Sequence, residues 1–293
     1  FKQKTAYEIP KRDWSSDVCS SDLMTPEQGL KMDLGLKDRV AIVTGGNRGI
    51  GYAISAELLK EGANVVVASL DPGRNAQAVE KLKAGAKGKV IGVPTDLTDP
   101  AAIENLFKKT LAEFGRLDIL VNNATNVVQG SFFAMDEAAW DRAFENKLRG
   151  TVRCIRLAVP AMRERKWGRI VNISGGAAWT PQLGAIATGM NNAAVQNLTV
   201  ALANELAKDG ILVNAIVPTA VRTERHDQNI KDTMAKTGQS EAEVLKPRVA
   251  KIPLGRMGTS EEIANVVVFM CSERASFVAG SLWAVDGGVS ARL

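Results

Sequence analysis

The fold of this chain is decided at Val40–Gly51, which reads VAIVTGGNRGIG. The first four residues are apolar and mostly β-branched, which is typical of a buried strand. The glycines that follow allow a tight turn, and apolar residues at helical spacing resume from Ile50 to Leu59. The free N–H groups at the start of such a helix attract a phosphate group. This context favours a dinucleotide-binding loop over an ordinary turn between a strand and a helix.

Residues 1–23 show neither a helical nor a strand period. They resemble a translated sequencing adapter more than a native protein segment. We interpret them as a non-native, disordered leader without a functional role. The native chain is expected to start at Met24 or Met32, and residues 24–293 are expected to form a single domain.

The composition argues against several classes of function. The net charge is +5, from 37 Lys and Arg against 32 Asp and Glu, and the basic residues are scattered, so no nucleic-acid interface is expected. Outside the leader only Cys154 and Cys271 remain, far apart and without a CxxC pair. We therefore predict neither disulfides nor a metal site. With no apolar run of the roughly 20 residues that a membrane span needs, and no credible signal peptide, we expect a cytoplasmic protein without membrane contacts.

Short apolar strands alternate with amphipathic helices from Val40 onward. The strands lack polar alternation, which is typical of parallel sheets covered on both faces. We therefore predict an α/β fold with a single Rossmann-type doubly wound parallel sheet flanked by helices. Residues 222–253, polar at first and then helical, fall outside the alternation and are expected to form a lid over the strand ends, where such sheets bind ligands. The predicted strands are Val40–Thr44, Asn64–Ser69, Lys89–Val93, Ile119–Asn122, Ile170–Ser174, Leu212–Ile216 and Leu282–Val285, and the clearest helices are Pro100–Phe114, Glu137–Arg163 and Ala193–Leu206.

Further motifs follow the glycine loop in a fixed order. They are Asp96-Leu97, Asn122-Asn123-Ala124 with Thr125 in place of a glycine, Trp140-Asp141-Arg142, the GRIVNIS run at 168–174, the PTAVRT run at 218–223 and the VDGG run at 285–288. With these motifs the chain resembles a short-chain dehydrogenase/reductase of the classical type over nearly all of residues 37–290. The resemblance implies hydride transfer between nicotinamide C4 and a carbonyl or alcohol carbon.

The resemblance also implies that the chain binds NADP or NAD. An acidic side chain at the end of the second strand would bind the ribose hydroxyls of NAD and repel a 2′-phosphate, but that position holds Ser69. Arg48 and Arg74 could meet a phosphate instead, so NADP is mildly favoured, although Leu70 stands where NADP-binding relatives often place arginine. The expected cofactor-binding residues are Gly45, Asn47, Arg48, Gly49, Ile50, Gly51, Ser69, Asp96, Leu97, Asn123, Ala124, Pro218 and Thr223.

All four catalytic positions of the family are substituted in this chain. Family members use a tyrosine whose pKa, near 10 in water, is lowered by a lysine four residues later, with a serine and an asparagine assisting. Aligning the flanking motifs places the tyrosine at Thr188, the lysine at Asn192, the serine at Gly175 and the asparagine at Lys147. Tyr52, the one tyrosine outside the leader, lies in the cofactor-helix region and is badly placed for chemistry.

Two titratable residues could supply the missing proton. Position 147 has lysine where the family has asparagine, and position 192 has asparagine where the family has lysine. This exchange could keep one ammonium in the pocket. A partly buried lysine with a lowered pKa can act as an acid. The alternative is a surface lysine on a shifted helix. His226, the only histidine, could reach substrate from the lid, but a lone histidine on a polar loop is more often solvated. The candidate catalytic residues are Lys147, Asn192, His226 and Thr188, which could orient a carbonyl or begin a helix.

Three classes of function stay open. The leading one is a divergent NAD(P)-dependent oxidoreductase that acts on a small carbonyl or alcohol with a non-standard proton donor; Trp179 and Pro181 suggest an apolar or aromatic substrate. The second is an NAD(P)-binding pseudoenzyme subunit that pairs with an active relative. The third is a non-redox, lyase-like enzyme that reuses the pocket. The resemblance implies a homodimer or homotetramer built through the helices at 137–163 and 193–206.

Overall fold

The computed structural model describes residues 32–125, 128 and 130–290. The expected leader, residues 1–23, and Met24, one of the two expected starts, lie outside the described residues. One compact unit spans Leu34–Leu293.

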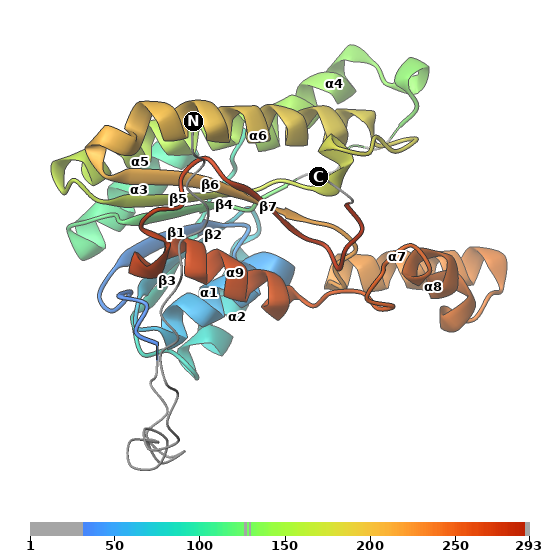
Figure 1. Ribbon diagram of the computed structural model, residues 1–293, viewed down its shortest axis with the longest axis horizontal. Coiled ribbons are helices and arrows are strands. Elements are labelled where there is room, and N and C mark those ends of the chain that lie inside the picture. The colour runs from blue at the N-terminus through green and yellow to red at the C-terminus, as the bar shows by residue number, and fades with distance from the viewer. Residues whose placement is uncertain (1–31, 126–127, 129, 291–293) are drawn as a thin grey trace, which may run out of the picture. The chain divides into compact units, whose positions relative to one another are not determined.

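Seven parallel strands form one sheet in the order β3-β2-β1-β4-β5-β6-β7 (Figure 1). β1 lies between β2 and β4, so the chain winds outward in both directions from the boundary of β1 and β4. This confirms the predicted doubly wound α/β fold and places the switch point, where such folds bind ligands, at the end of β1. The strands are β1 (Val40–Thr44), β2 (Asn64–Ser69), β3 (Val90–Pro94), β4 (Ile119–Asn122), β5 (Gly168–Ile173), β6 (Ile211–Pro218) and β7 (Leu282–Val285).

Helices cover both faces of the sheet. In Figure 1, α3 (Pro100–Phe114), α5 (Gly150–Glu164) and α6 (Ile186–Leu206) lie over one face, and α1 (Gly49–Lys60), α2 (Pro72–Lys83) and α9 (Ser260–Cys271) lie over the other. Ala41 and Val43 of β1 belong to the core under α1 and α9, whereas Ile42 belongs to the core on the opposite face. Because successive strand side chains point to opposite faces, a strand buried on both sides must be apolar throughout, and this explains the absence of polar alternation.

The region predicted as one helix, Glu137–Arg163, is interrupted. It divides into α4 (Glu137–Phe144), the π-helical turn η4 (Glu145–Arg149) and α5. Turns of this kind insert an extra residue into an α-helix and are frequent at functional sites. Lys147 is the buried residue of this turn. α6 begins at Ile186, earlier than the predicted Ala193, so Thr188 lies in its first turn.

The segment expected as a lid, residues 222–253, contains α7 (Glu224–Thr237) and α8 (Glu241–Val249), which extend beyond the sheet in Figure 1. It is helical from Glu224, earlier than the sequence pattern indicated, because the Thr223 hydroxyl accepts a hydrogen bond from the first turn and caps the helix. Arg222 forms ion pairs with Asp227 of α7 and Glu241 of α8, both at 2.8 Å. These pairs join the two helices into one unit.

Candidate functional site

The glycine loop between β1 and α1 has a geometry that only glycine permits. Gly45 and Gly49 have φ values of 64° and 53°, in the left-handed region that side chains disfavour. Gly51 lies against the loop so closely that a Cβ there would collide with the carbonyl oxygen of Gly45. The start of α1, with its free N–H groups, is therefore held next to the turn, as a phosphate site requires.

The loop is fixed in place by Asn123 and Thr44. The Asn123 side chain donates hydrogen bonds to the carbonyl oxygens of Thr44 (3.0 Å) and Gly45 (3.2 Å). The Thr44 hydroxyl accepts from the backbone N–H groups of Asn123 (3.0 Å) and Ala124 (3.1 Å). The Asn-Asn-Ala motif thus clamps the glycine loop to the end of β4.

A pocket of about 540 Å³ opens at the carboxyl ends of β1, β2 and β4, beside this loop. Of the predicted cofactor-binding residues, those that line it are Gly45, Asn47, Arg48, Gly49, Ile50, Ser69, Asp96, Leu97, Asn123, Ala124 and Thr223. Gly51 and Pro218 do not line it: Gly51 is buried behind the loop and Pro218 ends β6. Arg74, which the sequence analysis named as a possible phosphate contact, also lines it. The lining residues that the sequence analysis did not assign are Ala68, Leu70, Asp71, Thr95, Thr125, Asn146, Glu224 and Arg225.

Two lining residues carry buried oxygen atoms without a hydrogen-bond partner in the described part of the chain. They are the hydroxyl of Ser69 and the side-chain carbonyl of Asn146. Buried polar groups are normally hydrogen-bonded, so both atoms suit a ligand that carries hydroxyl groups. A dinucleotide has such groups on both riboses, and the pocket residues therefore fit it. Asn146 directly precedes Lys147, which the sequence analysis aligned with the family's asparagine.

Three arginines (Arg48, Arg74 and Arg225) and three carboxylates (Asp71, Asp96 and Glu224) line this pocket. Arg74 lies 3.6 Å from the carboxylate of Asp71, which also caps the N-terminus of α2. Arg48 and Arg225 line the pocket as well, and burial together with the positive charge of Arg48 lowers the pKa of Arg225. In the described part of the chain, Arg48 and Arg225 are the lining arginines without an ion pair, so their guanidinium groups can donate hydrogen bonds to a phosphate group.

Lys147 and Asn192 are hydrogen-bonded to each other, and neither of them lines the nucleotide pocket. The Lys147 Nζ donates to Asn192 Oδ1 at 2.6 Å and lies 3.5 Å from the carbonyl oxygen of Ser174. Lys147 is only 7% exposed, so the alternative of a surface lysine is wrong. Burial lowers the pKa of Lys147 from 10.5 to about 8.

Gly175, which the sequence analysis aligned with the family's serine, leaves room for this pair. A Cβ at Gly175 would lie 2.7 Å from Asn192 Nδ2. A larger residue at 175 would thus displace the Asn192 amide that holds Lys147. Residues 147, 175 and 192 therefore depend on one another for space and hydrogen bonding.

Hydrogen bonds connect this cluster to Trp179. The Ser174 hydroxyl donates to the backbone oxygen of Asn192 (3.2 Å) and accepts from Gln196 Nε2 (2.9 Å). Gln196 Oε1 in turn accepts from the indole N–H of Trp179 at 2.7 Å. The orientation of Trp179 is therefore tied to the backbone of α6 that carries Asn192.

His226 lies within the lid rather than in the nucleotide pocket. Its Nε2 is 2.9 Å from Arg248 Nη1, and because arginine only donates hydrogen bonds, Nε2 is the acceptor and the ring is neutral. Burial and the charge of Arg248 lower the pKa of His226. Its neighbours Glu224 and Arg225 line the pocket, whereas His226 does not.

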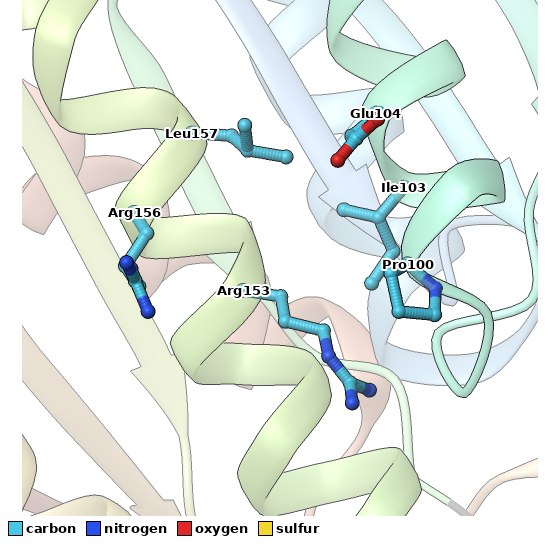
Figure 2. Close-up of a pocket in the computed structure, with 6 residues that line it drawn as sticks. All are labelled: Pro100, Ile103, Glu104, Arg153, Arg156 and Leu157. Atoms are coloured by element: carbon cyan, nitrogen blue, oxygen red, sulfur yellow. The ribbon is translucent and has the colours of Figure 1, made fainter.

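A second, smaller pocket of about 220 Å³ lies between α3 and α5 (Figure 2). Its lining includes Pro100, Glu104 and Arg153, the last of which forms an ion pair with Glu145 of η4. None of the predicted site residues lines it. In residues 32–125, 128 and 130–290, no group of three or more His, Cys, Asp or Glu side chains is placed to hold a metal ion. No helix of that same part is long and apolar enough to cross a membrane.

The parallel sheet, the clamped glycine loop and the pocket at its switch point define a Rossmann-type dinucleotide-binding protein. A family model described as enoyl-(acyl carrier protein) reductase matches residues 45–290. The chain belongs to the short-chain dehydrogenase/reductase superfamily of NAD(P)-dependent oxidoreductases.

Several known proteins resemble the chain over almost their whole length. The 3-oxoacyl-[acyl-carrier-protein] reductase FabG of Aquifex aeolicus is 34% identical over 88% of this chain and 100% of that protein. The 3alpha-hydroxysteroid dehydrogenase of Mediterraneibacter gnavus is 35% identical over 86% and 97%. The crystal structure of L-sorbose reductase from Gluconobacter frateurii, complexed with NADPH and L-sorbose, superposes with a TM-score of 0.87 at 32% identity, over 89% of this chain and 100% of that one.

Proposed function

We propose that this protein transfers hydride between NADP(H) and the carbonyl or alcohol carbon of a small substrate, with Lys147 as the proton donor in place of the family's tyrosine. The observation that carries the proposal is the buried contact of Lys147 Nζ with Asn192 Oδ1, at 2.6 Å. It supports an ammonium that is held in a defined position and whose pKa of about 8 lies near physiological pH.

A lysine with this pKa can work in both directions. Near pH 7 the ammonium predominates and can protonate the alkoxide that forms during reduction, directly or through one water. The neutral amine accepts the proton in the oxidation direction. Asn192 Oδ1 and the Ser174 carbonyl oxygen accept from two of the three N–H groups, which leaves the third for the substrate or a water.

The pocket residues support NADP as the cofactor. When bound, the nicotinamide supplies or accepts the hydride. The N–H groups of the glycine loop would hold the pyrophosphate, and Asp96 and Leu97 would flank the adenine. Ser69, where an acid would repel a 2′-phosphate, and the nearby Arg48 and Arg74 suit the extra phosphate of NADP. L-sorbose reductase is complexed with NADPH, and a second structural relative, YwfH, is described as an NADPH-dependent reductase at 28% identity and a TM-score of 0.81.

The substrate is proposed only as a small carbonyl or alcohol compound. The names of the relatives include a 3-oxoacyl carrier protein, a hydroxysteroid and a sugar, so they favour no single class. Trp179, hydrogen-bonded to Gln196 and connected to the Lys147 cluster, supports an apolar or aromatic surface on the substrate.

We further propose that the protein is a homodimer or homotetramer with α6 at an interface. Met190 and Val200 of this helix remain 49% and 40% exposed in the single chain. Exposed large apolar side chains on one element suit a contact with another subunit. Sedimentation of the pure chain tests this, and a monomer that associates only with an active relative would instead support a partner subunit.

The test begins with fluorescence titration of the full chain with NADPH and NADH. A Gly49→Trp variant, which fills the phosphate loop, should not bind either nucleotide. A screen of carbonyl substrates then compares the wild type with Lys147→Met and with Lys208→Met, the same change at an exposed lysine. We expect turnover to fall at least about 100-fold in Lys147→Met only, in line with the loss of a general acid.

Each other outcome contradicts a part of the proposal. Equal turnover in Lys147→Met and Lys208→Met would remove Lys147 as the proton donor. Substrate conversion without a change in nicotinamide absorbance would indicate the lyase-like alternative. Absence of binding to either nucleotide would remove the oxidoreductase function altogether.

A further inference from the structure

Gln196 of α6 uses both ends of its side-chain amide inside the protein. Its Nε2 donates to the Ser174 hydroxyl at 2.9 Å, and its Oε1 accepts from the indole N–H of Trp179 at 2.7 Å. The side chain is only 6% exposed. The amide has a single orientation, because a flip would turn its NH₂ group toward the indole N–H, which also donates. Gln196 therefore fixes Ser174 and Trp179 relative to each other.

Ser174 connects Gln196 to the buried ammonium of Lys147. Its hydroxyl donates to the backbone oxygen of Asn192 at 3.2 Å, and its own carbonyl oxygen lies 3.5 Å from Lys147 Nζ. The other acceptor of Lys147 is Asn192 Oδ1, at 2.6 Å. Asn192 and Gln196 are four residues apart on α6, so their side chains lie on the same face of the helix. Both acceptors of the ammonium thus belong to residues that this hydrogen-bond network holds.

Trp179 forms the outer end of the network. It lies in the segment between β5 and α6, it is partly exposed, and residues 180–183 that follow it are exposed. Because the indole N–H is bonded to Gln196, the surface that Trp179 can offer to a ligand is the apolar part of its ring. An apolar ring and a buried ammonium therefore lie at the two ends of one chain of hydrogen bonds.

We propose that Gln196 is a positioning residue for Lys147: it holds Trp179 and Ser174 so that the aromatic or apolar part of a carbonyl substrate, packed against Trp179, fixes the acceptors of the ammonium. The inference rests on the proposed function, in which Lys147 donates the proton. Binding energy from a part of the substrate that does not react can be used to orient the groups that do. The apolar part of the substrate is therefore expected to raise kcat as well as affinity.

The first test needs no substrate. It compares Gln196→Met, which keeps the length of the side chain and removes both hydrogen bonds, with Gln182→Met at an exposed position of the same segment. The pKa of Lys147 is lowered by burial alone, and no charged group of the described residues contributes. Once its acceptors lose their fixed positions, water reaches the ammonium and the pKa rises toward its ordinary value.

Urea unfolding at a series of pH values measures this change. The free energy of unfolding of the wild type is expected to increase between pH 7 and pH 9.5, and in Gln196→Met this increase should shrink by at least about half. Gln182→Met should behave as the wild type. A general loss of stability would lower the curve equally at every pH. An unchanged pH dependence in Gln196→Met would overturn the proposal whatever the activity of the variant.

The second test uses 4-phenylbutan-2-one and butan-2-one, which have the same methyl ketone and differ in the phenyl group. The wild type should reduce the phenyl compound with the higher kcat. In Gln196→Met this kcat should fall about tenfold, as for the loss of a buried hydrogen bond, and the advantage over butan-2-one should disappear. The Kd for NADPH should not change, because neither Gln196 nor Trp179 lines the nucleotide pocket. Equal kcat values for the two ketones in the wild type would contradict the role of Trp179.

A double-mutant cycle tests the connection itself. Trp179→Phe removes the indole N–H and keeps an aromatic ring. If Trp179 acts through Gln196, each single variant loses about tenfold in kcat and the double variant loses about tenfold as well. A loss of about 100-fold in the double variant would mean that the two residues act independently, and the proposal would be wrong.

The outcomes separate this inference from the proposed function. If Gln196→Met matches the wild type in pH dependence and in turnover, the role of Gln196 is refuted while the oxidoreductase proposal stands. If the pH dependence differs as expected but the wild type reduces no carbonyl compound, Gln196 still positions Lys147 and the proposed reaction is refuted.

Discussion

Replacement of Lys147 by methionine provides the sharpest test of the site, because it separates the stability cost of the buried ammonium from its chemistry. Methionine keeps the length of the side chain and removes the charge. Burial lowers the pKa of Lys147 from 10.5 to about 8. Since one pKa unit corresponds to about 1.4 kcal/mol, the ammonium destabilises the folded protein by about 3 kcal/mol at pH 7.

The pH dependence of this cost has a definite sign. The folded pKa lies below the unfolded value, so between about pH 8 and 10.5 the unfolded chain binds more protons than the folded protein. The free energy of unfolding of the wild type therefore increases as the pH rises through this window, because Lys147 loses its proton. Below pH 8 the full cost is present.

Lys147→Met also removes a hydrogen bond, which offsets part of the stability gained by removing the buried charge. Asn192 Oδ1 loses its donor, which costs about 1–3 kcal/mol. At pH 7 the variant should thus range from equal stability to about 2 kcal/mol more stable than the wild type. Between pH 7 and pH 9.5, the free energy of unfolding of the wild type should rise by about 2 kcal/mol relative to that of the variant.

Urea unfolding at a series of pH values measures this difference, with Lys208→Met as the control for any lysine replaced at the surface. The variant and the wild type should have equal m-values, so that only the midpoints change. Parallel stability curves for Lys147→Met and the wild type would refute the desolvation of Lys147. The role of Lys147 as an acid near neutral pH would then lose its physical basis.

Three further predictions concern the same cluster and the lid. Gly175→Ser should displace the Asn192 amide and lower both the stability, by about 1–3 kcal/mol, and the turnover, whereas unchanged unfolding would mean that the pocket has room for a hydroxymethyl group. In the reduction direction, kcat/KM should decrease as the pH rises through about 8, where Lys147 loses its proton, and a level profile would contradict this. Protonation of His226 beside Arg248 should loosen the lid as the pH falls below 6.5, since the lowered pKa of this histidine means that the folded protein resists the proton. Hydrogen exchange of α7 should show this loss of protection in the wild type but not in His226→Gln.

The fold was predictable because a single strand contributes side chains to the core on both faces of the sheet. Ala41 and Val43 serve one face and Ile42 the other, so an unbroken apolar run before a glycine loop leaves little choice but a covered parallel strand. The pocket residues of the glycine loop were predicted from the motif that follows this strand. Their function needs backbone geometry more than a particular tertiary partner.

Two features of the site were not visible in the sequence. The π-helical turn Glu145–Arg149 adds a residue that a 3.6-residue period does not reveal. Asn146 of this turn lines the pocket and has a buried, unpaired oxygen, but it was not among the expected site residues. Arg225 escaped notice because its position depends on the contact of Thr223 with the glycine loop, residues far apart in sequence. His226 was predicted from its chemistry, but Arg225 lines the pocket and His226 does not.

The contacts among residues 147, 175 and 192 favour the proposed active site over a site without a function. A site without a function has no reason to retain a buried ammonium that costs about 3 kcal/mol; ordinary substitutions to apolar residues would remove that cost. Here Lys147 is retained, Asn192 supplies the acceptor it needs, and the absence of a side chain at Gly175 leaves space for that acceptor. A buried charge that lowers stability and is accommodated by its neighbours is typical of a functional position. For this reason we favour an enzyme with a lysine acid over a subunit that merely binds the cofactor.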